Sequence, residues 1–257
     1  MPTTSQRLLS ILALAVMLAG CRGGDPSPSS QQADVPDGAA AAVITVDPTP
    51  LASMRQAGAD ELPDASRAVL MDMRIDAKAR TADPDGRTSE AVSAALGSQA
   101  TIVGSLDGAF TRPRSREQAH LADTADGSRW IVILGGQEPL RMDGEGVRYL
   151  LASPDIDGNG SNELVLRVDT SQEGVVETDL TVLTFDGDQA ATVARFEGAR
   201  VDGCASADPH LRAHRIEYGR PASGSDWPEF VSIGSQSECV DGAAPDFDGY
   251  VGAEQPL

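Results

Sequence analysis

The sequence is poor in the residues that many ligands and reactions require. Aromatic residues make up only 4% of its 257 residues, and it has three histidines and three cysteines. Basic residues are also scarce, since 20 lysines and arginines stand against 39 aspartates and glutamates and the formal net charge is −19. A surface with this charge repels nucleic acid and anionic lipid headgroups. We therefore predict no nucleic-acid partner and interpret most of the acidic residues as solubilising.

The chain also lacks the short motifs of several enzyme classes. It has no GxSxG elbow, no phosphate-binding P-loop, no HExxH pair and no GxGxxG after a strand. His210 and His214 are four residues apart, but no third ligand has suitable spacing for zinc. We interpret Trp130, Trp227 and Phe230 as core residues rather than as a sugar platform, because few aromatic residues are available to fill the core. A carboxylate pair for glycoside hydrolysis stays open, since nothing selects one pair among so many acids.

The N-terminus does carry a recognisable pattern. Arg7 precedes an apolar run over residues 8–20, which has the length of a signal-peptide core and is short for a transmembrane helix. The run ends in Leu18-Ala19-Gly20-Cys21, which resembles the lipobox of bacterial lipoproteins. This resemblance implies cleavage before Cys21 and acylation of that cysteine, so that the chain reaches the membrane through a lipid anchor. An ordinary cleaved signal peptide with a free thiol is the alternative.

Three regions follow from this interpretation. Residues 1–20 are predicted to be a signal peptide, residues 21–62 a lipidated and disordered tether, and residues 63–257 an exported β-rich domain. The tether is rich in proline, serine and alanine, and only residues 41–46 offer an apolar run. A short helix is predicted near residues 51–56. In the lipoprotein resemblance, Arg22 after the lipidated cysteine favours the outer membrane of a Gram-negative cell envelope.

The remaining cysteines and the strand-like runs define the expected domain. Cys204 and Cys239 are predicted to form one disulfide in an exported protein. Residues 89–97 predict a helix that Gly97 ends, whereas residues 68–75 fit a capped helix or a buried strand. Apolar runs bounded by glycine and aspartate turns predict strands at residues 101–103, 130–134, 147–151, 163–168, 180–185, 191–196, 212–218 and 229–233. We expect a mainly β fold of antiparallel sheets with one or two short N-terminal helices, and no Rossmann-like sheet.

The segment from Asp155 to Glu163 has the spacing of a cation-binding loop. Side-chain oxygens recur at every second position, and Gly160 supplies a backbone conformation that few other residues adopt. The predicted oxygen donors are Asp155, Asp157, Asn159, Ser161 through its carbonyl, and Glu163. An EF-hand would need a glutamate at position twelve of the loop, where this chain has Leu166. An aspartate-rich turn without metal is the alternative.

The loop resembles the calcium loops of FG-GAP and VCBS repeats, the blades of integrin-type β-propellers. The matching residues are the five predicted donors, with glycines at Gly158 and Gly160. The resemblance implies one structural Ca²⁺ and a blade-like unit around residues 145–197. Asn159 departs from the usual aspartate, and segments at 107–117 and 224–231 echo the loop without its alternating donors. We expect weak calcium affinity, with a Kd of about 10⁻⁵ to 10⁻³ M.

These observations predict a location more firmly than an activity. The predicted protein is a membrane-anchored envelope lipoprotein with a binding or interaction role, and its partner is an unidentified protein or glycan. The alternative is a periplasmic hydrolase or an enzyme accessory protein whose active site has no evident motif.

Overall fold

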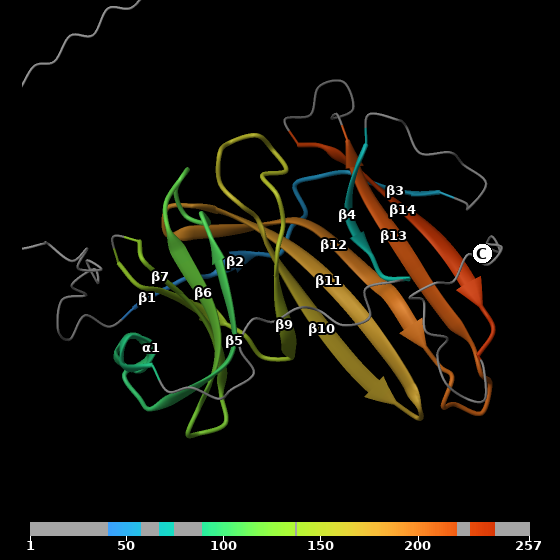
Figure 1. Cartoon of the computed structure of the whole chain (residues 1–257), viewed down its shortest axis with the longest axis horizontal. Coiled ribbons are helices and arrows are strands. Elements are labelled where there is room, and N and C mark those ends of the chain that lie inside the picture. The colour runs from blue at the N-terminus through green and yellow to red at the C-terminus, as the bar shows by residue number, and fades with distance from the viewer. Residues whose placement is uncertain (1–40, 58–66, 75–88, 137, 220–226, 240–257) are drawn as a thin grey trace, which may run out of the picture. The chain divides into compact units, whose positions relative to one another are not determined.

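The computed structural model describes residues 41–57, 67–74, 89–136, 138–219 and 227–239, all within one compact unit that spans residues 35–257. The predicted signal peptide and Cys21 lie outside these ranges. The described chain is mainly β, with one helix and fourteen strands (Figure 1). The predicted fold class is thus confirmed at this level. The described strands form two sheets, and no closed propeller is seen among them.

The first sheet has five strands in the order β1-β8-β7-β6-β5. Its strands are β1 (Ala42–Val43), β5 (Ala100–Gly108), β6 (Glu117–Thr124), β7 (Arg129–Leu134) and β8 (Leu140–Asp143). All of its pairings are antiparallel except that of β1 with β8. The sequence patterns predicted β5 and β7, whereas β6 and β8 were missed.

The second sheet has nine strands, seven of them in the order β3-β14-β13-β12-β11-β10-β9. In addition, β2 pairs with β12 and β4 pairs with β13. Its strands are β2 (Val46–Asp47), β3 (Met54–Ala57), β4 (Ala68–Asp72), β9 (Val147–Ala152), β10 (Leu164–Gln172), β11 (Val175–Asp186), β12 (Gln189–Asp202), β13 (Leu211–Gly219) and β14 (Glu229–Ser237). The ambiguous segment at residues 68–75 is therefore a strand in β4. The predicted hairpin is confirmed as β11 and β12, with Asp186 opposite Gln189 across the turn.

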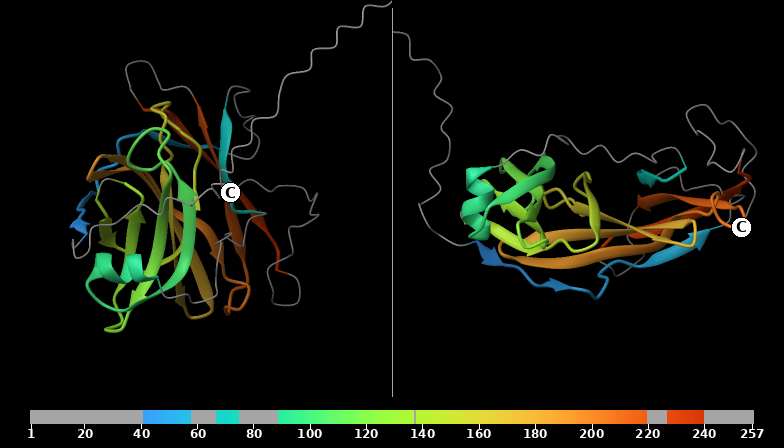
Figure 2. Two further views of the ribbon diagram at one scale, coloured as in Figure 1. Left: turned by 60° about the vertical axis from the view of Figure 1, so that its left-hand side comes forward. Right: turned by 90° about the horizontal axis from the view of Figure 1, so that it is seen from below.

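The helix α1 (Glu90–Leu96) forms where the sequence predicted it. The side chain of Ser89 accepts a hydrogen bond from the backbone N–H of Val92, and Gly97 ends the helix in the left-handed conformation at φ 67°. Val92 and Ala95 are buried against the five-stranded sheet, in a cluster that includes Val132 of β7. The helix thus covers one face of that sheet (Figure 2).

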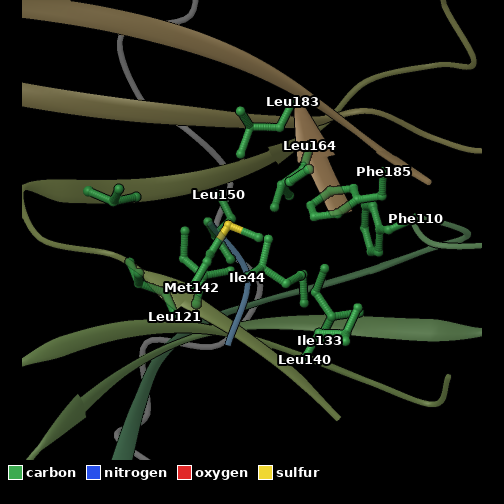
Figure 3. Close-up of a cluster of buried hydrophobic side chains, with 14 residues drawn as sticks. Ile44, Phe110, Leu121, Ile133, Leu140, Met142, Leu150, Leu164, Leu183 and Phe185 are labelled. Atoms are coloured by element: carbon green, nitrogen blue, oxygen red, sulfur yellow. The ribbon is translucent and has the colours of Figure 1, made fainter. Parts of the chain in front are cut away.

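The other face of the five-stranded sheet packs on the nine-stranded sheet. Alternate residues of β7, Ile131 and Ile133, point away from α1 into a cluster with Leu164 of β10 and Leu183 of β11. Figure 3 shows this cluster, to which Phe110 and Phe185 contribute aromatic rings. Burial of these apolar side chains is the main contribution that holds the sheets together. A second cluster, which includes Phe196 and Phe230, lies within the nine-stranded sheet.

Residues 41–57, here called the N-terminal strap, correct the predicted tether. This segment adds β1 to β8, β2 to β12 and β3 to β14, each in parallel pairing. The blue trace in Figures 1 and 2 follows it from one sheet to the other. The helix predicted near residues 51–56 is wrong, because Met54–Ala57 is a strand. The local helix propensity of residues 51–56 is overridden, because β3 forms backbone hydrogen bonds with β14 of the sheet. The β domain therefore begins before residue 63.

Candidate metal centre

The candidate loop connects β9 to β10 in the nine-stranded sheet. Its base is closed by a hydrogen bond from the backbone N–H of Ser153 to the carbonyl of Glu163, at 3.1 Å. Directly after this bond, Leu164 enters β10 with both strand neighbours in register. The buried strand fixes the position of Glu163, so one end of the loop is held by the sheet.

Inside the loop, carboxylates accept backbone hydrogen bonds from residues that follow them. Asp155 accepts from the N–H of Gly158 and from the N–H of Gly160, both at 2.7 Å. Asp157 accepts from the N–H of Asn159 at 3.0 Å. Gly158 and Gly160 have φ values of 80° and 90°, a region that residues with a Cβ rarely adopt. The chain therefore curls around its own acidic side chains.

Three of the five predicted donors converge. One carboxylate oxygen each from Asp155, Asp157 and Glu163 lies within 4.8 Å of the other two. Asn159 contacts this group, because its Nδ2 donates to Asp157 Oδ2 at 2.9 Å. Its Oδ1 accepts from the N–H of the buried Ser161 at 2.7 Å. Four of the five predicted residues are thus connected through their side chains.

Glu163 is the informative member of the group, because its residue exposure is 0%. Its Oε2 accepts a hydrogen bond from the N–H of Ile156 at 2.8 Å. Its Oε1 is buried and has no hydrogen-bond partner among the described residues. A buried carboxylate oxygen without a partner is costly, and most such oxygens in proteins are paired or bind a metal. The Glu163 side chain contributes one oxygen to the converging group, so a cation held by the three carboxylates would bind at this buried side chain.

The electrostatics of the group point the same way. Burial raises the pKa of Glu163 to about 7, and the negative charges of Asp157 and Asp155 add to the effect. Burial also raises the pKa of Asp157, to which the neighbouring Asp155 contributes. The pKa of Tyr218 is raised by burial and then by the charges of Glu163 and Asp155. Carboxylates placed together without a counter-charge resist ionisation, which a bound cation reverses.

A second buried glutamate, Glu117, provides a comparison in which the protein pairs both carboxylate oxygens. Glu117 begins β6 after the loop that follows β5, and its residue exposure is 2%. Its Oε2 accepts from the N–H groups of Phe110 at 2.6 Å and Thr111 at 2.8 Å, and its Oε1 accepts from the Thr111 hydroxyl. Both oxygens of Glu117 are therefore paired, whereas Glu163 leaves one free for a cation.

The two glutamate loops are joined to each other. Ala109 and Asn162 exchange hydrogen bonds, and the N–H of Arg114 donates to the carbonyl of Gly160 at 3.3 Å. One loop belongs to the five-stranded sheet and the other to the nine-stranded sheet. Sequence reasoning noticed the echo at 107–117 but missed this contact. It also missed Tyr218, which lies at the end of β13 with no local pattern to mark it.

The other sequence candidates are structural in the described part of the chain. His210 Nδ1 lies 2.7 Å from the carbonyl of Asp208, and His214 Nδ1 lies 2.9 Å from Ser232 Oγ. Neither joins a cluster of metal-ligating side chains among the described residues. Phe230 is fully buried, as predicted for a core residue.

Two cysteines and both tryptophans also have defined surroundings in the structure. Cys204 and Cys239 lie at disulfide distance, with Cα atoms 5.4 Å apart, so the structure agrees with the predicted pairing. The guanidinium of Arg141 stacks over the ring of Trp130, 5.4 Å from its centroid. Trp227 is half-buried and packs against the second core cluster.

Comparisons with known proteins add no assignment to this geometry. No known family, curated protein or solved structure matches the chain. Within the described ranges, no helix has the length and apolar character needed to span a membrane. The function proposed below therefore depends on the site itself and on the sequence patterns.

Proposed function

We propose that the loop from Asp155 to Glu163 binds one Ca²⁺ ion, and that the protein is an envelope lipoprotein with a binding role. The observation that carries the calcium proposal is the buried side chain of Glu163. Its Oε1 has no partner among the described residues, and its carboxylate converges with those of Asp155 and Asp157. Its surroundings do not satisfy it, whereas those of Glu117 satisfy both oxygens.

The donor chemistry favours calcium over other common metals. Every candidate donor is an oxygen, and neither sulfur nor imidazole belongs to the group. Calcium takes six to eight oxygen ligands in a flexible arrangement, whereas zinc prefers nitrogen and sulfur. The FG-GAP-like spacing supports this choice for the loop alone. When bound, the ion would neutralise the carboxylates and hold the loop against its neighbour.

The hydrogen bonds between the two loops indicate that calcium binding would stabilise the fold. A cation at Glu163 would hold the loop that carries Gly160 and Asn162, and both residues hydrogen-bond to the loop of the other sheet. Calcium loading would thus strengthen the junction between the two sheets. In the described part of the chain, no histidine or cysteine joins the group as a base or nucleophile, so we infer an interaction protein rather than an enzyme.

A thermal denaturation series tests the calcium proposal. With a Kd of about 10⁻⁴ M, calcium at about 10 mM should stabilise the fold by about 3 kcal/mol. For a domain of this size, that corresponds to a Tm increase of about 5 to 10 °C. Asp157→Asn removes one charged donor and should abolish most of the increase. An unchanged Tm of the full chain at this calcium concentration would contradict the proposal.

Two matched variants separate calcium binding from general charge and folding effects. Asp188→Asn removes an exposed aspartate in the β11–β12 turn and should keep the full calcium response. Glu117→Gln disturbs the other glutamate loop and should lower the Tm without calcium, while the increase on adding calcium persists. Equal loss of the response in Asp188→Asn and Asp157→Asn would indicate non-specific screening instead.

The lipoprotein part of the proposal depends on Cys21 and is tested separately. The full chain expressed in a Gram-negative host should appear in the membrane fraction with an acylated Cys21 at its N-terminus, as read by mass spectrometry. Cys21→Ser should give a chain that carries no acyl group and is not cleaved before position 21, as read by the same mass spectrometry. An unlipidated N-terminus in the wild type would refute the anchor.

A further inference from the structure

A cleft of about 550 Å³ lies beside the candidate calcium loop. Its walls come from five separate parts of the chain: the loop, the N-terminal strap, the β5–β6 loop, the β11–β12 hairpin and Trp227. Among the residues that line it are Asp157, Asn159, Ser161, Leu51, Gln189 and Trp227. Three of the five proposed calcium donors thus face this cleft.

We propose that this cleft binds a neutral, hydroxyl-rich ligand, namely a saccharide, when the loop carries calcium. The inference rests on the proposed calcium site and names the ligand class that the loaded protein would recognise. Ligand pockets usually combine an apolar wall with a few well-placed polar groups, and this cleft has both.

The charges that line the cleft select against ionic ligands. Asp47, Asp157 and Asp186 line it, and no lysine or arginine is among the described residues of its lining. In the calcium-loaded protein, anionic ligands would still meet Asp47 and Asp186, with no basic side chain among the described lining residues to pair with. A calcium ion held at Asp157 would in turn repel an ammonium or guanidinium group at that wall. A neutral ligand with hydroxyl groups avoids both penalties.

Trp227 supplies the apolar surface that such a ligand needs. Its side chain is half-buried and packs against the core cluster that contains Phe230, so its position is fixed before a ligand arrives. Preorganised side chains lose little entropy on binding. Leu51, which is 41% exposed, adds a second apolar contact from the strap. The C–H face of a sugar ring can pack on such a surface, since it is itself apolar.

Polar side chains that line the same cleft provide the hydrogen bonds. Gln189 and Asn159 each offer donors and acceptors, Asp186 offers acceptors, and all three are exposed. Sugar hydroxyls both donate and accept, so they can pair with all of these groups. Because Asp157 and Asn159 belong to the calcium loop as well, removal of calcium would loosen one wall of the cleft.

A glycan array probed with the full chain in millimolar calcium tests the inference. The array carries neutral oligosaccharides, oligosaccharides with uronic or sialic acids, and a cationic glucosamine series. We expect retention on neutral glycans, and loss of it in a chelator. The retained oligosaccharide is then titrated in solution, in a Trp130→Phe background where Trp227 is the only indole, since the chain has two tryptophans.

Substitutions of residues that line the cleft should weaken saccharide binding by different amounts. Gln189→Ala should weaken binding about tenfold, as should Leu51→Ala, because each removes one contact to the ligand. Trp227→Ala should abolish detectable binding. Gln189 and Leu51 are exposed, so their variants report on the cleft even if Trp227→Ala fails to fold. Gln172→Ala, an exposed control on β10, should bind as the wild type does.

The outcomes separate the two proposals. A calcium-dependent Tm increase without retention on any neutral glycan would overturn the saccharide inference and leave the calcium site standing. Retention on charged glycans alone would overturn it as well. Retention on neutral glycans that persists in the chelator, with no effect of calcium on Tm, would contradict both the calcium site and the calcium dependence of binding.

Discussion

Ala109 and Asn162 hydrogen-bond to each other twice across the junction of the two sheets. The N–H of Asn162 donates to the carbonyl of Ala109 at 2.6 Å, and the N–H of Ala109 donates to Asn162 Oδ1 at 3.0 Å. Asn162 Nδ2 also donates to the carbonyl of Ser153 at 3.1 Å, within its own loop. One asparagine side chain thus holds both the shape of the candidate calcium loop and its attachment to the neighbouring loop.

Asn162→Ala should therefore destabilise the fold although Asn162 is not a proposed calcium donor. The change leaves the N–H of Ala109 and the carbonyl of Ser153 without these partners, and we expect a loss of about 1 to 3 kcal/mol in the free energy of unfolding. Urea denaturation measures it. Gln172→Ala, an exposed change, should stay within about 0.5 kcal/mol of the wild type. Equal stability of both variants would show that the Ala109 contact contributes little.

Glu117→Gln tests how strongly a loop depends on its buried carboxylate. The glutamine keeps the size of the side chain but turns one acceptor into a donor, which then faces the donors of Phe110 and Thr111. We expect a loss of about 2 to 3 kcal/mol, measured by denaturation in a chelator. Glu163→Gln should cost less under the same conditions, because Glu163 Oε1 has no partner to lose. The reverse order would contradict the comparison of the two loops.

His120 should make stability depend on pH. Burial lowers its pKa in the folded protein, and its Nδ1 lies 2.8 Å from Ser105 Oγ. The unfolded chain binds a proton more readily, so the fold loses stability as pH falls through about 6.5 and beyond. In His120→Gln this loss should be smaller between pH 7.5 and 5.5, as measured by denaturation at each pH (about 25 °C). Subtracting the free energy of unfolding of the variant from that of the wild type at each pH cancels the contributions of the other titrating groups, including His214. An unchanged slope would exclude His120 as its source.

Reduction of the disulfide should loosen the edge of the nine-stranded sheet. Cys204 follows β12 and Cys239 follows β14, and their sequence separation is 35. The chain-entropy model gives a loss of about 3 to 4 kcal/mol on opening a loop of this length. Denaturation with and without a reductant measures it, and Cys204→Ala/Cys239→Ala should show no further effect of the reductant. Reaction of both thiols with a probe in the native, unreduced protein would contradict the pairing.

Much of the second half of the fold could be predicted, because its strands are long and bounded by clear turns. The β11–β12 hairpin alternates on both sides of Asp186-Gly187-Asp188, and α1 has both of its caps in the sequence. By contrast, β6 contains His120, Asp123 and Glu117, and its polar residues hid its periodicity. The strap was missed for another reason: its short strands have no local pattern and exist only because sheet edges accept them.

The candidate site was predictable in its donors but not in its surroundings. Spacing alone indicated Asp155, Asp157 and Glu163, since alternating oxygens around a glycine turn are a local property. The free oxygen of Glu163, the paired oxygens of Glu117 and the contact between their loops depend on how two sheets meet. Residues far apart in the sequence produce these features, so no local pattern encodes them.

The N-terminal strap has a consequence for the order in which the chain can fold. Met54 pairs with Phe230 and Ala42 pairs with Leu140, so each strap strand needs a partner that is synthesised much later. Contacts of such long sequence separation form slowly, since a large loop must close first. Synthesis runs from the N-terminus, so β3 of the strap must wait until β14 has been made. The described segment that is synthesised first is therefore among the last to complete the two sheets.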